Sequence, residues 1–97
     1  MGHDIYGFDS GNPDEANEVS YLRRGAFGDA AREIYKALGA ENHDCGCSGC
    51  GGDPVFFSKD QLVAARDKLP AGDDMAPERS FLDDCIASGD GVWVAFW

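Results

Sequence analysis

The chain has 97 residues, of which 43% are hydrophobic and 11% aromatic, so it can fold as one domain and is too apolar for a disordered segment. Eighteen Asp and Glu against eight Lys and Arg give a formal net charge of −10. This charge argues against binding to nucleic-acid polymers, whose phosphates require clustered Lys and Arg, whereas an acidic surface favours solubility and attracts basic partners.

No export or membrane segment is predicted. The first ten residues, "MGHDIYGFDS", carry charge and lack the apolar stretch of a secretory signal. The longest apolar run, "VWVAFW" at 92–97, is far shorter than the roughly 20 residues of a membrane helix. We therefore expect a cytoplasmic protein without a membrane partner.

The N-terminal part of the chain predicts a strand followed by two helical segments. The strand is "HDIYGF" at 3–8, which ends at the turn-prone "DSGNPD". The pair Asn-Pro at 12–13 is typical of a helix start, so we expect a helix over 14–24. A second helix is expected over 28–39, with Gly39 at its left-handed end. The apolar face of this second helix comprises Phe27, Ala30, Ala31, Ile34, Tyr35 and Leu38.

The C-terminal part predicts a short strand, two helices and a final strand. "PVFF" at 54–57 is the short strand, and a capping box at 58–61 begins a helix that stops at Pro70. The last helix is expected over 77–88, and its apolar stripe is Phe81, Leu82, Cys85 and Ile86. "GVWVAFW" at 91–97 is apolar on both faces, which predicts a central strand. The order β-α-α-β-α-α-β indicates a single α+β domain over 1–97, with about three strands backed by three or four helices.

The stretch "HDCGCSGCGG" at 43–52 is open to several interpretations. In the first, Cys47 and Cys50 form a C-x-x-C knuckle whose thiolates bind one zinc ion across a tight turn. The remaining ligands would come from Cys45, His43 or Cys85. Strong zinc motifs carry two separated pairs, and Cys85 fits a buried, inert thiol in the stripe of its helix. The predicted metal ligands are therefore Cys45, Cys47, Cys50 and His43.

A redox interpretation makes Cys47 and Cys50 a dithiol couple. Such couples usually open a helix, whose N-terminus lowers the pKa of the thiol, whereas here "GGDP" follows and cannot begin a helix. A structural disulfide is disfavoured by the expected cytoplasmic location, although three neighbouring thiols can oxidise. A flexible loop without a site is a further alternative.

A third interpretation treats the glycine-rich loop as a nest of backbone amides for an anion. The loop lacks the Lys of a P-loop and the spacing of a dinucleotide motif. Arg23-Arg24, the only adjacent basic pair in the sequence, either lies on a solvated helix face or joins the loop in an anion site. The predicted ligand-binding residues are Tyr21, Arg23, Arg24, Ser48, Gly49 and Gly51. We expect the arginine pair and the loop to border one concave surface, provided that the chain folds back near Gly28.

No catalytic arrangement is predicted. His3-Asp4 and His43-Asp44 each place an imidazole beside a carboxylate, but neighbouring side chains on an extended chain point apart. The acidic pairs at 73–74 and 83–84 are typical of solvated faces and do not form a calcium-binding loop pattern. We therefore expect that the protein is not an enzyme.

Part of the sequence resembles a group of small uncharacterised bacterial and phage-encoded proteins. The resemblance rests on "EVSYLRRGAFGDAAREIY" at 18–35, the Cys-Gly loop, "FSKDQL" and "FLDDCI". Tyr21, Arg23 and Arg24 align with a Y-W-R-K-like segment of that group, and Leu22 departs from its Trp. The resemblance implies an accessory role in a phage or mobile element, without an activity.

These observations predict a small acidic, non-catalytic binding protein. Its partner would be a host protein or a small anionic, nucleotide-like ligand, and no cofactor is required. The alternative is a structural zinc-binding module built on the Cys-Gly loop.

Overall fold

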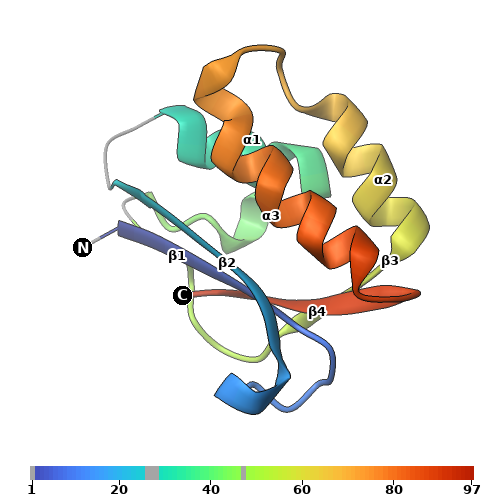
Figure 1. The fold of residues 1–97 in the computed structure, drawn as a ribbon. Coiled ribbons are helices and arrows are strands. Elements are labelled where there is room, and N and C mark those ends of the chain that lie inside the picture. Colours follow the sequence, from blue (N-terminus) through green and yellow to red (C-terminus); the bar gives the residue numbers. More distant parts are fainter. Residues whose placement is uncertain (1, 26–28, 47) are drawn as a thin grey trace.

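A computed structural model describes residues 2–25, 29–46 and 48–97. Over these residues the chain forms an antiparallel sheet with strand order β2-β1-β4-β3 and three α-helices that lie together on one face of the sheet (Figure 1). The elements are β1 (Gly2–Phe8), β2 (Glu18–Gly25), α1 (Asp29–Leu38), β3 (Val55–Ser58), α2 (Lys59–Lys68), α3 (Ala76–Ala87) and β4 (Gly91–Phe96). None of the helices within the described residues has the length and apolar character needed to cross a membrane.

The predicted α+β class is confirmed, but the helix expected over 14–24 is wrong. Its helix-start signal is used by a single 3-10 turn, Glu15–Asn17, where the Asp14 side chain accepts a hydrogen bond from the turn. The chain then continues as β2, with Leu22 opposite Ile5 of β1. Alternation of buried and exposed side chains along β2 allows it to lie on a sheet with one covered face. The sheet therefore has one strand more than the three expected.

The other predicted elements are confirmed. The helix expected over 28–39 is α1, and Gly39 adopts a φ of 68° at its end. The capping box is present, since Ser58 Oγ accepts from the Gln61 amide at 3.3 Å and Gln61 Oε1 accepts from the Ser58 amide at 2.8 Å. The final strand, β4, lies centrally between β1 and β3. Three positions of the predicted apolar face are not among those that the structure describes, namely Phe27 and the side chains of Ala30 and Ala31.

The core lies between the helices and the face of the sheet that they cover, here called the covered face. The strands and helices supply Ile5, Leu22, Ile34, Tyr35, Leu62, Phe81, Leu82, Val92, Val94 and Phe96. Close packing of α3 on β1 requires Gly7, because a Cβ there would lie 2.9 Å from Cys85 Sγ. The predicted burial of Cys85 is confirmed, with no exposed surface, and burial raises the pKa of its thiol to about 12.

The covered face also holds an ion pair between the half-buried Arg24 and the buried Glu78. Arg24 donates from Nε to Glu78 Oε2 at 2.7 Å and from Nη2 to Glu78 Oε1 at 2.5 Å, and Nη2 also donates to the Asp74 carbonyl. Glu78 is completely buried, so this fork-shaped pair neutralises a carboxylate inside the fold. The hydrogen bond to Glu78 raises the pKa of the Arg24 guanidinium. The pair joins β2 to α3.

Candidate functional site

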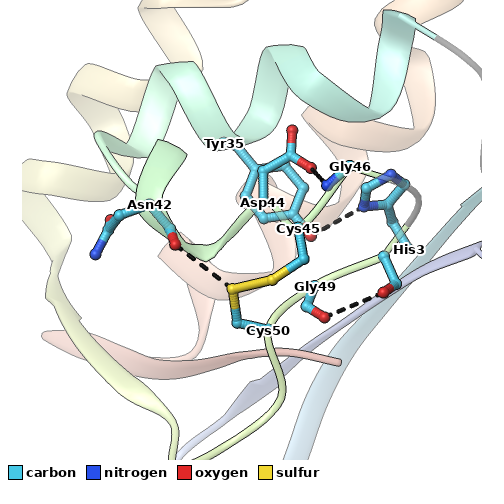
Figure 2. Close-up of a disulfide and its surroundings, with 9 residues drawn as sticks. His3, Tyr35, Asn42, Asp44, Cys45, Gly46, Gly49 and Cys50 are labelled. Atoms are coloured by element: carbon cyan, nitrogen blue, oxygen red, sulfur yellow. Dashed lines mark hydrogen bonds between the residues drawn. A yellow bond between two sulfur atoms is a disulfide. The ribbon is translucent and has the colours of Figure 1, made fainter.

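The Cys-Gly loop is closed by a disulfide between Cys45 and Cys50, with Cα atoms 5.5 Å apart (Figure 2). Within the loop, Asp44 Oδ1 accepts from the Gly46 amide at 2.9 Å. The Cys50 amide donates to the His43 carbonyl at 2.9 Å. The expectation that the compartment disfavours a structural disulfide is corrected here, since the two sulfurs are bonded to each other.

This pairing bears on the metal and redox interpretations. Neither Cys45 nor Cys50 is a free thiolate, and the couple is not the predicted pair of Cys47 and Cys50. Cys47 lies outside the described residues. The His43 ring stacks on Phe96, with centroids 5.1 Å apart. Among the residues that the structure describes, no group of three or more His, Cys, Asp or Glu side chains is placed to hold a metal ion, so zinc binding stays a prediction that requires the reduced loop.

The loop is anchored on the end of β4. The Gly51 amide donates to the Phe96 carbonyl at 2.9 Å, and a Cβ at Gly49 would overlap the Phe96 backbone. The indole Nε1 of Trp97 donates to the Gly52 carbonyl at 3.0 Å. The predicted amide of Gly51 is therefore used by β4, Gly49 packs directly on the Phe96 backbone, and Ser48 Oγ donates to the Gly49 carbonyl at 3.2 Å. The loop fixes the orientation of the C-terminal tryptophan.

The two predicted arginines point to opposite faces of the sheet. Arg24 binds Glu78 on the covered face, whereas Arg23 lies with its Nε 3.8 Å from Asp4 Oδ1 on the other face. Tyr21 also donates to Asp4, at 2.6 Å. Among the described contacts, none joins either arginine to the loop.

A cavity of about 340 Å³ lies beside the loop, and its charged groups are different from those predicted. It is lined by Arg32, Tyr35, Lys36, Glu41, Asp44 and Gly46. Arg32 Nε lies 3.9 Å from Asp44 Oδ2, and Arg32 Nη2 donates to the Gly46 carbonyl at 3.3 Å. Figure 2 shows the Tyr35 hydroxyl against His3, where Oη and Nδ1 are 3.0 Å apart. Cations and carboxylates are mixed in this cavity, which does not favour an anion strongly.

The face of the sheet away from the helices, here called the open face, carries a group of aromatic side chains. They are Tyr6, Phe8, Tyr21, Phe56, Trp93 and Trp97. Strand register brings them together, since Tyr6 lies opposite Tyr21, and Trp93 lies opposite both Phe8 and Phe56. The centroids of Tyr6 and Tyr21 are 4.6 Å apart and those of Phe56 and Trp93 are 5.3 Å apart.

Several of these rings remain accessible. Tyr21 is 44% exposed, Phe56 is 47% exposed and Trp97 is 37% exposed. The loop after β1 approaches the open face at one point, where a Cβ at Gly11 would lie 3.6 Å from the Trp93 ring. Aromatic side chains are enriched in protein interfaces, because they bury a large area at low cost in conformational entropy.

A second cavity, of about 240 Å³, is hollowed into the open face. Its lining residues are Tyr6, Phe8, Pro13, Glu15, Glu18 and Trp97. A register shift between Gly7 and Phe8 places Glu18 opposite Phe8, and the 3-10 turn brings Glu15 to the same rim. Aromatic rings and carboxylates together attract cations, so this cavity is matched to positive charge.

Comparison of the chain with protein-family models, with curated proteins and with solved structures finds no match. The features of the molecule that bear on function are therefore its two cavities and the two faces of its sheet.

Proposed function

We propose that the protein is a non-catalytic binding protein whose open face contacts a basic segment of another protein. The observation that carries this proposal is the aromatic open face with acidic side chains at its rim. The net charge of −10 supports it, because an acidic surface attracts a basic partner over a distance of several ångströms. The resemblance to small uncharacterised bacterial and phage-encoded proteins implies an accessory role, which favours a host protein as this partner.

A protein partner is better supported than a small anionic ligand. Arg23 and Arg24 each face a carboxylate, and the cavity beside the loop contains Glu41 and Asp44 as well as Arg32 and Lys36. An anion would have to displace these carboxylates and overcome the repulsion of the whole chain. A basic peptide would meet rings and carboxylates that already face solvent.

The test is a binding titration with a lysine-rich peptide, an acidic peptide of the same length and ATP. We expect the lysine-rich peptide alone to bind, with an affinity that falls as salt is added. The Tyr21→Ala/Phe56→Ala double variant should bind it at least about tenfold more weakly, because exposed aromatic anchors commonly contribute more than 1 kcal/mol each.

A matched control is Val63→Ala on α2, since Val63 is 40% exposed but lies on a helix. We expect this variant to bind like the parent protein. Binding of ATP without binding of the peptide, or equal weakening by the control, would contradict the proposed function.

A further inference from the structure

The cavity on the open face has three aromatic walls. The rings of Tyr6 and Phe8 are nearly parallel, with an angle of 14° and centroids 5.9 Å apart. Trp97 is inclined to both, at 50° to Tyr6 and 48° to Phe8, with centroid distances of 5.2 and 6.0 Å. The three rings thus form a corner rather than a flat surface. A group entering the corner meets more than one ring, which is the arrangement that favours a cation.

The carboxylates at the rim are available to a ligand. Glu15 and Glu18 are exposed, and neither takes part in an ion pair among the described residues. Glu15 lies on the 3-10 turn and Glu18 lies at the start of β2, so both belong to elements with regular backbone structure. Their negative charges add to the attraction of the ring faces for a cation.

The size of the cavity restricts the ligand. At about 240 Å³ it is smaller than the roughly 300–1,000 Å³ typical of pockets for drug-sized molecules. It suits a side-chain head group rather than a nucleotide. Trp97 is also positioned in advance, because its indole donates to Gly52 and its backbone amide donates to the Asp4 carbonyl at 2.8 Å. A preorganised wall loses little entropy when a ligand binds.

We propose that this cavity binds an alkylammonium group, presented by a lysine side chain of the basic partner, with a methylated lysine as the best-matched form. Methylation spreads the positive charge of the ammonium over an apolar methyl surface. Because this surface is less strongly hydrated than a free ammonium, it can contact aromatic rings directly. The identity of the partner in this inference rests on the proposed function. The chemistry of the alkylammonium group rests on the cavity itself.

The test uses choline and its neutral isostere 3,3-dimethylbutan-1-ol, followed by peptides that carry lysine, trimethyllysine or acetyl-lysine at one position. Binding is followed by NMR of the Trp97 indole N–H and of the ligand methyl protons, which ring currents shift upfield. We expect choline to shift Trp97 but not Trp93, and the neutral isostere to bind at least about tenfold more weakly. The trimethyllysine peptide should bind best and the acetyl-lysine peptide worst.

Three variants test the walls and the rim of the cavity. Trp97→Leu should reduce choline binding at least about fivefold, whereas Trp97→Phe, which keeps a ring, should reduce it less. The Glu15→Gln/Glu18→Gln double variant should weaken choline more than its isostere. Asp67→Asn is a control for overall charge, because Asp67 is exposed on α2, and it should leave choline binding almost unchanged.

The possible outcomes separate the two proposals. Binding of a lysine-rich peptide to the open face, without a shift of Trp97 and without competition by choline, overturns the ammonium site and leaves the proposed function standing. Choline binding at Trp97 together with no peptide binding supports the site and overturns the protein partner. Equal binding of choline and its neutral isostere shows an apolar pocket and overturns the inference.

Discussion

The covered and open faces of the sheet are built from the same alternating strands but use their side chains differently. On the covered face, the charged side chains of Arg24 and Glu78 are paired with each other within the fold. On the open face, rings such as Tyr21 and Phe56 contact neighbours on one side and solvent on the other. We therefore expect substitutions on the covered face to act on stability and, under the proposed function, those on the open face to act on binding. Substitutions on the two faces should have separable effects.

The largest expected effect distinguishes two adjacent arginines. Arg24→Ala leaves Glu78 buried without its partner, so we expect the free energy of unfolding to fall by about 3–5 kcal/mol. Arg23→Ala removes a side chain that is 68% exposed, and it should change stability by less than about 0.5 kcal/mol. Urea unfolding of both variants measures the difference. Equal destabilisation would contradict the division between the faces.

Reduction of the disulfide has the next largest expected effect. Opening the link between Cys45 and Cys50 should lower the free energy of unfolding by about 2 kcal/mol, because the closed loop is short. Trp97 should respond as well, since the same loop holds its indole. Thermal unfolding and tryptophan fluorescence, each with and without dithiothreitol, measure both effects. The Cys45→Ser/Cys50→Ser double variant should not respond to the reductant.

Alkaline pH probes two buried groups on the covered side of the sheet, Cys85 and Tyr35. Burial raises the pKa of Cys85 from its ordinary 9.0 to about 12 and that of Tyr35 from 10.0 to about 12. A group whose pKa is higher in the folded than in the unfolded protein contributes its full stabilisation at pH values below the unfolded-state pKa. This stabilisation is lost as the pH rises toward the folded-state pKa. We expect Cys85 to cost about 1 kcal/mol of stability by pH 10, and both groups to cost more by pH 12.

The check on this pH dependence is urea unfolding between pH 8 and 12. Cys85→Ala should flatten the decline that begins near pH 9. The same thiol should resist modification by a thiol reagent at pH 8 in the native protein. A steep loss of stability below pH 8, or rapid modification of Cys85, would show that this part of the core is open to solvent.

The smallest expected effect on stability comes from the open face. Phe56→Ala should change the free energy of unfolding by less than about 1 kcal/mol, because half of the ring surface stays in solvent. The same variant should weaken binding of a lysine-rich peptide measurably. Val63→Ala on α2 should alter neither quantity beyond about 0.5 kcal/mol. A large loss of stability in Phe56→Ala would place this ring in the core instead.

Sequence signals that involve only a few neighbouring residues predicted the ends of helices well. The capping box at 58–61 and Gly39 at the end of α1 lie where expected, because each is satisfied by bonds within a few residues. The Asn-Pro signal at 12–13 was also genuine, but it starts only a 3-10 turn. Nothing near Arg24 in the sequence indicates its partner, since Glu78 lies 54 residues away. That contact helps to hold β2 as a strand on the covered face.

The candidate site was harder to predict than the fold. Its rings come from β1, β2, β3, β4 and the C-terminal residue, and they meet only through strand register. Once 14–24 is assigned as a helix, Tyr21 cannot be placed beside Tyr6. Three cysteines within six residues also allow alternative pairings, so the link between Cys45 and Cys50 follows from geometry rather than spacing. The even spacing of Tyr6 and Phe8 and of Trp93 and Trp97, which puts each pair on one face of its strand, is the signal that would have revealed the open face.

The most direct test of the central claim is a residue-by-residue NMR map of the ¹⁵N-labelled protein titrated with a lysine-rich peptide. We predict chemical-shift changes at alternate, outward-facing positions of the strands, including Tyr6, Tyr21 and Phe56, and at the Trp97 indole. Helices α2 and α3 should remain unperturbed. Shifts confined to the helices or to the loop at 43–52, or none at a peptide concentration that saturates binding, would contradict the assignment of the open face as the binding surface.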